Sequence, residues 1–72
     1  MKNVLLTGAN GLLGQKLVYA LKSRNDIELL ATGIGQNRLI DQANYSFQSL
    51  DITNETEVDQ TIKQFSPHVI IN

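Results

Sequence analysis

The chain has 72 residues and a formal net charge of −1, with 42% hydrophobic and 18% charged residues, no cysteine and one histidine. This length allows at most one small domain, and the scattered lysines and arginines do not favour a nucleic-acid partner. The absence of cysteine excludes disulfides, thiolate metal sites and cysteine nucleophiles, and the lone His68 excludes a multi-histidine metal site.

The N-terminal segment carries no recognisable targeting signal. After Met1-Lys2-Asn3, only three apolar residues, at positions 4–6, precede the first glycine. That run is too short for the core of a signal peptide and for a membrane span. We therefore expect a cytoplasmic protein with no membrane partner.

The first part of the chain predicts a strand, a helix and a second strand. The apolar run at residues 4–6 is typical of a strand buried on both faces. Residues 11–23 are expected to form a helix, with residues 24–26 as the turn that follows. A second strand is expected at residues 27–32, ended by Gly33-Ile34-Gly35. The spacing i, i+4, i+7 and i+8 predicts the packing stripe of the helix, which is Leu13, Leu17, Ala20 and Leu21. The side chains expected to face water are Gln15, Lys16 and Lys22.

The second part begins with a mainly polar stretch at residues 36–44, which we expect to be an irregular loop. Residues 45–50 alternate, with Tyr45 and Phe47 on one side and Ser46 and Gln48 on the other. This alternation predicts a third strand at the edge of the sheet.

A second helix has a clear beginning and a clear end. Asn54 is a good N-cap, and Glu57 three residues later can complete a capping box. Pro67 ends the helix by keeping Ser66 out of the helical region. The buried stripe is expected to be Val58, Ile62 and Phe65. Residues 69–71 predict the last strand, and His68 reads as a polar residue leading into it.

This order of elements predicts an α/β fold. Parallel strands joined by right-handed crossovers form a doubly wound sheet of order 3-2-1-4, with one helix on each face. The crevice between the first and fourth strands is the topological switch point, where such sheets bind ligands. The glycine-rich turn at residues 7–14 lies at its mouth.

That turn is spaced Gly8-x-x-Gly11-x-x-Gly14. Glycine lets the backbone come close to a phosphate, and the N–H groups and dipole of the following helix favour an anion. We therefore expect the turn to bind the pyrophosphate of a nicotinamide dinucleotide. The alternative is a tight turn without a ligand. A nucleotide-triphosphate P-loop does not fit, because Gly14-Gln15-Lys16 is not Gly-Lys-Ser/Thr and Ala9 occupies the required glycine position.

The sequence TGANGLLG at residues 7–14 resembles the T-G-x-x-G-x-x-G signature of the extended short-chain dehydrogenase/reductase superfamily. Asp51-Ile52-Thr53 and the segment FSPHVIIN at residues 65–72 are similar to its dTDP-4-dehydrorhamnose reductase-like branch. The resemblance covers the whole chain but only the N-terminal part of such an enzyme. It implies a partial Rossmann-type sheet, with residues 1–72 as the N-terminal part of an NAD(P)-binding domain and the catalytic and substrate-binding parts outside them.

The resemblance also implies roles for individual residues. The group that would hold the pyrophosphate, partly through backbone N–H groups, is Gly8, Asn10, Gly11, Leu12 and Leu13. Gly14 would permit close packing of the helix on the strand. Asp51 and Ile52 would contact adenine, and the alternative for Asp51 is a solvated acid near a helix start.

The choice between the two nicotinamide cofactors depends on the second strand. An NAD site usually has an acidic residue at the tip of that strand. Glu28 lies 20 residues after Gly8 but at the strand's beginning. Thr32 and Gly33 stand at the tip, where Gly33 is a candidate cofactor-binding residue. Arg38 could pair with a 2′-phosphate, although an ordinary exposed arginine is the alternative. We favour NADP over NAD.

No catalytic residue can be assigned. The superfamily's Tyr-x-x-x-Lys pair is missing, because Tyr19 is followed by Lys22 three positions later and Tyr45 by Ser49 four positions later. The resemblance implies part of an NADPH-dependent reductase acting on the 4-keto group of a nucleotide sugar. The alternatives are a non-catalytic NADP-binding relative, such as the regulatory β subunit of methionine adenosyltransferase, and a nucleotide-sugar epimerase or dehydratase. The apolar strand at residues 69–71 would form a sheet edge, so we expect the isolated fragment to be marginally stable or to self-associate.

Overall fold

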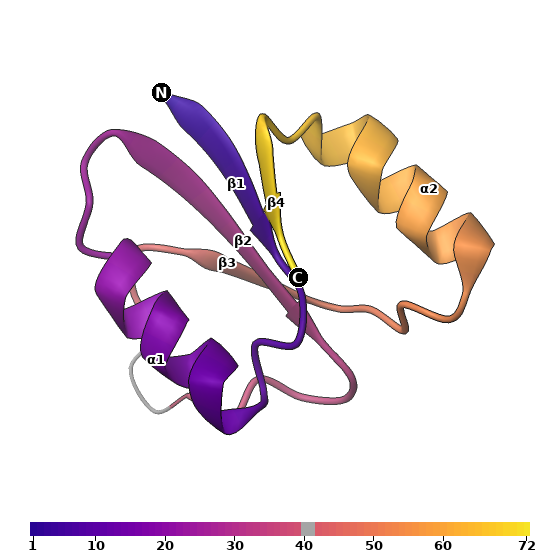
Figure 1. The fold of residues 1–72 in the computed structure, drawn as a ribbon, viewed down its shortest axis with the longest axis horizontal. Coiled ribbons are helices and arrows are strands. Elements are labelled where there is room, and N and C mark those ends of the chain that lie inside the picture. Colours follow the sequence, from indigo (N-terminus) through magenta and orange to yellow (C-terminus); the bar gives the residue numbers. More distant parts are fainter. Residues whose placement is uncertain (40–41) are drawn as a thin grey trace.

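A computed structural model describes residues 1–39 and 42–72. The loop expected at residues 36–44 includes positions 40 and 41, which lie outside the described residues. The helices and strands appear in the predicted order, as Figure 1 shows: β1 (Lys2–Leu6), α1 (Leu12–Leu21), β2 (Ile27–Gly33), β3 (Ser46–Ser49), α2 (Glu55–Phe65) and β4 (Val69–Ile71).

The four strands form one parallel sheet of order β3-β2-β1-β4. In its register Val4 lies opposite Leu29 on one side and Val69 on the other. The strands run between the two helices (Figure 1). The predicted Rossmann-type arrangement, with four parallel strands and two helices, is therefore confirmed.

Each face of the sheet packs under a different helix. Val4, Leu6, Leu29 and Ala31 share the face covered by Val18 of α1 and belong to the main core cluster. Leu5 faces the other way and lines the hollow beneath α2. Complete burial of a leucine or valine side chain stabilises a fold by about 1.5–3 kcal/mol, so this alternation fixes the register of the sheet.

The predicted packing stripe of α1 is wrong at two positions. Leu13 is 72% exposed and Ala20 is exposed, whereas Gly14 and Val18 are buried. The helix is turned by about one residue because Gly14, which has no side chain, lies directly against the backbone of Gly8.

Two side chains expected to face water, Gln15 of α1 and Lys22 directly after this helix, are instead half-buried. The Gln15 amide Nε2 donates to the backbone oxygen of Asn10 at 2.9 Å. The Lys22 ammonium lies 5.6 Å from the ring centroid of Tyr19 and 5.8 Å from that of Tyr45. Both positions therefore contribute contacts that the hydrophobic pattern does not reveal, while Lys16 is exposed as expected.

The predicted start of α2 is confirmed in part. The Asn54 side chain accepts a hydrogen bond from the Glu57 N–H at 3.2 Å. The reciprocal half of the capping box does not form, because the Asn54 N–H donates to the Asp51 backbone oxygen at 3.0 Å. The predicted end is confirmed, since α2 stops at Phe65 and Ser66 is left-handed with φ of 51°.

The packing stripe of α2 differs from the expectation. Thr61 is its fully buried residue, and Ile62 is 36% exposed. Thr61 is buried at no polar penalty because its hydroxyl accepts from Gln48 Nε2 of β3 at 2.9 Å. Val58 and Ile62 only line a hollow between α2 and the sheet.

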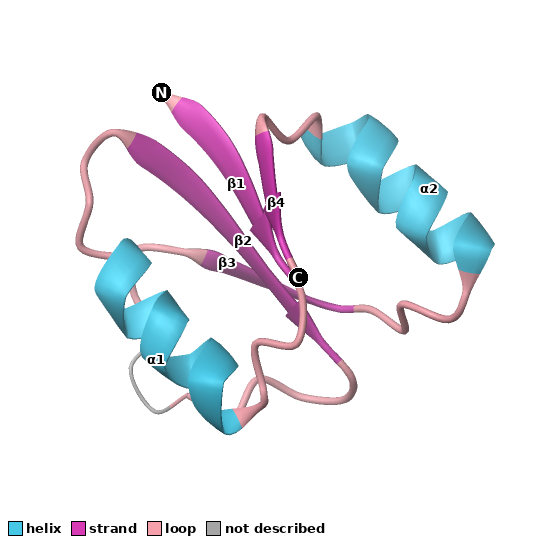
Figure 2. Ribbon diagram, viewed as in Figure 1, coloured by secondary structure: helices cyan, strands magenta, loops and turns pink. Residues whose placement is uncertain are grey.

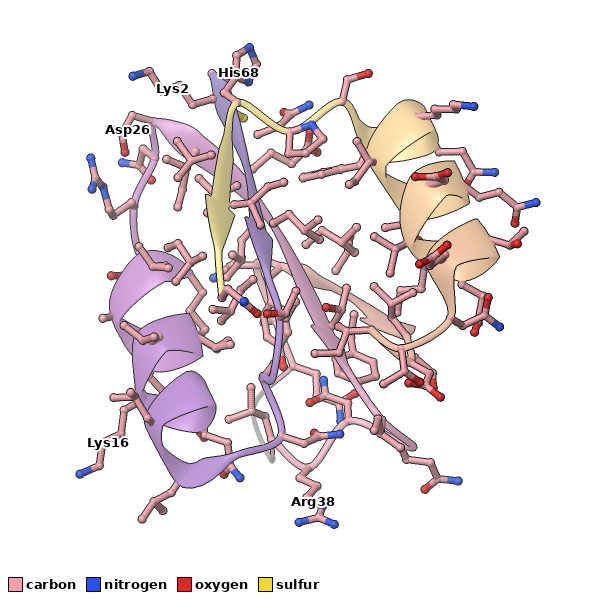
Figure 3. All side chains as sticks on the ribbon, turned by 45° about the vertical axis from the view of Figure 1, so that its right-hand side comes forward. Lys2, Lys16, Asp26, Arg38 and His68 are labelled. Carbon is pink, nitrogen blue, oxygen red and sulfur yellow. The ribbon has the colours of Figure 1, made fainter. Side chains whose placement is uncertain are left out.

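The strand ends differ slightly from the predicted ones. Gly33 is the last residue of β2 rather than the residue that stops it. His68 does more than lead into β4, because its Nδ1 accepts from the Asn3 N–H at 2.9 Å and its own N–H donates to the Asn3 oxygen at 2.8 Å. His68 therefore secures the start of β1, at the end of the molecule opposite Arg38 (Figure 3).

Candidate functional site

The candidate site lies where β1 and β2 end. The loops that follow these two strands meet at the same end of the molecule (Figure 2). This end therefore gathers most of the predicted site residues: Gly8, Asn10, Gly11, Leu12, Leu13, Gly14, Gly33 and Arg38. Asp51 and Ile52 follow β3 and reach the same edge of the sheet, because the Leu50 N–H donates to the Gly33 oxygen at 2.9 Å.

The glycine turn is held in place by its own backbone and by β2. Gly8 has φ of +68°, a conformation that residues with a Cβ rarely adopt. The Ala9 N–H donates to the Thr32 oxygen at 2.8 Å, and the Gly11 N–H donates to the Gly8 oxygen at 3.1 Å. The turn is thus a fixed feature of the fold rather than a free loop.

Gly14 brings α1 against this turn. A Cβ at Gly14 would lie 2.1 Å from the Gly8 oxygen and 2.8 Å from the Ala9 Cα. Both obstacles are backbone atoms, so no side-chain movement can relieve the contact. The close helix-to-strand packing that the resemblance implied for Gly14 is present in the structure.

The start of α1 presents free N–H groups. Its N-cap is Gly11, which has no side chain to accept a hydrogen bond. The first turn contains Leu12, Leu13 and Gly14, none of them acidic. Such a helix end carries about half a positive charge and N–H groups without intrahelical partners. A hollow of about 310 Å³ lies beside it, lined by the glycine turn, Leu12, Leu13 and Asn72.

Asn10 connects the glycine turn to the segment after β2. Its Nδ2 donates to the backbone oxygens of Ile34 and Gln36, each at 2.9 Å, and its Oδ1 accepts from the Arg38 N–H at 3.0 Å. All the polar atoms of this side chain are therefore bonded to the backbone of residues 34–38, named the 34–38 loop below. Gly33 packs closely against the same Asn10 side chain, since a Cβ at Gly33 would lie 3.1 Å from Asn10 Nδ2.

Arg38 is the positively charged residue of the segment that follows β2, while Lys16 of α1 lies toward the same end of the molecule (Figure 3). The Arg38 side chain extends into solvent beyond the end of the sheet (Figure 3). Glu28 lies far from it, because it pairs with Asn3 near the beginning of β1. The tip of β2 continues as Gly33-Ile34-Gly35, which offers no carboxylate.

Asp51 is organised by Thr53. Its Oδ1 accepts from the Thr53 hydroxyl at 2.7 Å and from the Thr53 N–H at 2.9 Å. These two bonds lower the pKa of the Asp51 carboxyl below its ordinary value, and the bond from the Thr53 hydroxyl has the larger effect. Ile52 is exposed and lines a hollow of about 260 Å³ with Leu5, Thr7 and Ile70.

Three residues support the site without having been predicted. Thr32 is fully buried, and its hydroxyl donates to the Leu6 oxygen at 2.9 Å, which ties the ends of β1 and β2 together. The Thr7 hydroxyl donates to the Asn72 Oδ1 at 2.6 Å across the switch point. A polar residue directly after the apolar run at residues 29–31 is the available signal for Thr32, whereas the partners of Thr7 and Asn72 depend on the fold.

Two classes of site find no support in the part of the chain that the structure describes. Neither α1 nor α2 combines the length and apolar content that crossing a membrane requires. Among the same residues, no cluster of three or more acidic or histidine side chains could hold a metal ion.

Comparison with known proteins places the whole chain in one family. The family model described as "RmlD substrate binding domain" matches residues 1–72. The dTDP-4-dehydrorhamnose reductase of Aggregatibacter actinomycetemcomitans is 38% identical over 72 residues, which are 100% of this chain and 20% of that protein. The methionine adenosyltransferase 2 subunit beta of Danio rerio is 39% identical over 71 residues, 99% of this chain and 20% of that protein. The chain thus spans about a fifth of the length of these relatives.

Solved structures agree on the fold. The dTDP-glucose 4,6-dehydratase of Bacillus anthracis in complex with NAD superposes with a TM-score of 0.77 at 26% identity, covering 97% of this chain and 26% of that one. The L-threonine dehydrogenase of Clostridium difficile gives a TM-score of 0.76 at 22% identity, over 97% of this chain and 23% of that one.

Proposed function

The chain belongs to the RmlD substrate binding domain family, and from that premise we propose that it is the cofactor-binding N-terminal part of an NADPH-dependent oxidoreductase. The substrate of the complete protein is a nucleotide sugar whose 4-keto group is reduced. The relationship to a dTDP-4-dehydrorhamnose reductase over the whole chain supports this assignment. When bound, the dinucleotide supplies the hydride.

One observation carries the proposal: the open glycine turn at the start of α1. Gly8 and Gly14 leave the main chain bare, and the first helical turn after Gly11 has N–H groups without intrahelical partners or a side-chain cap. A helix N-terminus of this kind suits a phosphate group. We assign the pyrophosphate to the backbone N–H groups of Leu12 and Leu13, with the bare main chain of Gly11 leaving room for its approach, beside the hollow that these residues line.

The preference for NADPH follows from the charges near the tip of β2. Arg38 stands there, and no carboxylate follows Gly33 in the next two positions. A guanidinium matches the geometry of a phosphate group. An acidic residue that would bind the ribose hydroxyls of NAD is missing at this tip, which also counts against an NAD-dependent epimerase or dehydratase.

Adenine is assigned to the other end of the site. Asp51 keeps one carboxylate oxygen that no described residue bonds, and this oxygen can accept a hydrogen bond from an exocyclic amino group. The neighbouring Ile52 is exposed and offers an apolar surface to a ring. Both residues follow β3, two strands away from β1.

A second candidate function is regulation without sugar reduction. The 39% identity to a methionine adenosyltransferase 2 subunit beta favours it as directly as the reductase match favours the first. The proposed cofactor site is the same in both cases. The difference lies in whether the complete protein oxidises the bound NADPH.

The test uses the complete protein that contains this chain. Calorimetric titration should give tighter binding of NADPH than of NADH, and Arg38→Ala should weaken NADPH about tenfold, since bonds to charged groups are strong, with NADH unchanged. Asn25→Ala, in the turn before β2, controls for the truncation of an exposed polar side chain outside the site. Equal losses for the two cofactors in Arg38→Ala would refute the NADPH assignment. Consumption of NADPH with a nucleotide 4-keto sugar separates the reductase from the regulator.

A further inference from the structure

The Asn10 side chain does not face the hollow that the pyrophosphate is proposed to occupy. Its Nδ2 donates to the backbone oxygens of Ile34 and Gln36, and its Oδ1 accepts from the Arg38 N–H. A carboxamide has two donors and one acceptor oxygen, so three backbone partners within five consecutive residues use every polar group it has.

These three bonds join segments far apart in the sequence. The partners of Asn10 lie 24, 26 and 28 positions further along the chain. Asn10 itself is fixed, because its backbone oxygen accepts from Gln15 Nε2 at 2.9 Å. These bonds therefore fix the position of the 34–38 loop relative to the glycine turn and the first turns of α1.

The far end of this loop has separate anchors. Leu39 is buried in the core cluster, and Asn37 Nδ2 donates to the Tyr45 hydroxyl at 2.7 Å. Loss of the Asn10 side chain would therefore free the backbone at Ile34, Gln36 and Arg38 without detaching the loop from the protein.

We propose that Asn10 is a positioning residue that sets the preference for a 2′-phosphorylated dinucleotide by holding the 34–38 loop, and with it Arg38, beside the glycine turn. The inference rests on the proposed function, because it assigns Arg38 to the 2′-phosphate. When only a fraction of molecules holds the binding arrangement, the apparent affinity falls by that fraction. Asn10 keeps Arg38 in the binding arrangement in most molecules, so that Arg38 can contact the 2′-phosphate.

This role differs from direct binding of the pyrophosphate in what it predicts. NADPH and NADH share the pyrophosphate, so a residue that binds it affects both cofactors equally. A residue that acts through Arg38 affects NADPH alone, and its effect disappears once Arg38 has been removed.

The experiment is a double-mutant cycle in the complete protein, read as NADPH and NADH affinity by calorimetry. Asn10→Ala should weaken NADPH by up to the roughly tenfold loss expected for Arg38→Ala, and change NADH less than about twofold. The double variant Asn10→Ala/Arg38→Ala should be no weaker for NADPH than Arg38→Ala alone. Asn25→Ala again serves as the matched asparagine control.

Gly33→Ala provides a second variant that keeps Asn10 in the chain. The added Cβ would lie 3.1 Å from Asn10 Nδ2, and 3.3 Å from both its Cγ and its backbone nitrogen, so the Asn10 amide must give by a few tenths of an ångström and its bonds to the loop weaken. It should show a smaller loss of NADPH affinity with the same selectivity over NADH. This variant also decides the question if Asn10→Ala yields too little folded protein.

Two results would overturn the inference while leaving the proposed function intact. One is an equal loss of NADPH and NADH affinity in Asn10→Ala, or in Gly33→Ala if only that variant folds. The other is a loss in the double variant that multiplies the two single losses. If the unaltered protein binds neither dinucleotide, or if Arg38→Ala is not selective, the proposed function itself fails.

Discussion

At the scale of single residues, Gly14 is the point where α1 meets the end of β1. The added methyl of Gly14→Ala would meet the Gly8 oxygen and the Ala9 Cα within 3 Å, so helix and turn must separate. Overpacking of this kind costs about 1–3 kcal/mol or more. We expect a loss of that size in the free energy of unfolding, measured by urea denaturation of the complete protein.

Gly11→Ala is the matched control for this substitution. A Cβ at Gly11 meets only the Gly8 oxygen, at 3.4 Å, which is ordinary contact. Its backbone φ of −72° is open to any residue. A Gly14→Ala protein as stable as the Gly11→Ala protein would show that the close approach of α1 to the turn is not needed.

A second prediction at this scale concerns the Asp51 carboxylate. Its pKa lies below the ordinary value in the folded protein, first because of the Thr53 hydroxyl. A lowered folded pKa adds stability above the ordinary pKa of an aspartate, and this contribution is lost as the pH falls through the folded pKa. Thr53→Val should raise the pKa of Asp51, which a carbon NMR titration of the carboxyl group measures.

Thr56→Val, on the exposed first turn of α2, controls for the loss of a nearby hydroxyl. It should leave the Asp51 titration where it is in the unaltered protein. An Asp51 titration that is the same in Thr53→Val and Thr56→Val would contradict the assigned cause of the shift.

At the scale of elements, α2 depends on its N-cap. Asn54 satisfies the Glu57 N–H, and the backbone of Asp51 holds Asn54 from the other side. Asn54→Ala should destabilise the protein by about 1 kcal/mol, seen as a lower urea midpoint. Gln60→Ala, at an exposed position inside the same helix, should leave the midpoint nearly unchanged. Equal urea midpoints for both variants would show that the Asn54 N-cap does not stabilise α2.

The helices also show what the sequence could and could not reveal. The start of α2 was readable because capping is a local interaction between residues three apart. The buried side of α1 could not be predicted in the same way. A hydrophobic pattern detects only residues with apolar side chains, and the closest contact of α1 is made by Gly14, which has no side chain. Thr61 was missed for a related reason, because its burial depends on Gln48 from a different strand.

At the scale of the whole molecule, the sheet ends at β4, which pairs with β1 on one side and is last in the strand order. Val69 is 42% exposed and Ile70 is 50% exposed on this edge. Apolar edge strands pair readily with other chains. A polypeptide of residues 1–72 alone should therefore form larger species as its concentration rises in sedimentation velocity experiments.

Ile70→Lys should reduce this association, because a charged side chain at a strand edge opposes edge-to-edge pairing. The Lys63 position on the exposed side of α2 offers a comparison, and Lys63→Ala should leave association unchanged. A stable monomer of the unaltered polypeptide across the whole concentration range would contradict the expected edge pairing.

The position of the candidate site was accessible from the sequence at this scale as well. Parallel strands bring their carboxyl ends to one edge, so the glycine turn, Gly33 and Asp51 were expected together there. The bonds from Asn10 to the 34–38 loop were not accessible. Their partners are 24 or more residues away and lie at Ile34 and in the polar stretch that follows, which has no periodic pattern.

The central claim is that the bare main chain at the start of α1 binds the pyrophosphate of a dinucleotide. Its most direct test is a titration of the complete, isotope-labelled protein with NADPH, followed by the amide chemical shifts. The largest changes should fall on the amides of Leu12 and Leu13, whereas the Gly11 N–H is already bonded to the Gly8 oxygen. Saturating NADPH that leaves the Leu12 and Leu13 amides unmoved, or that moves a different set, would contradict the account.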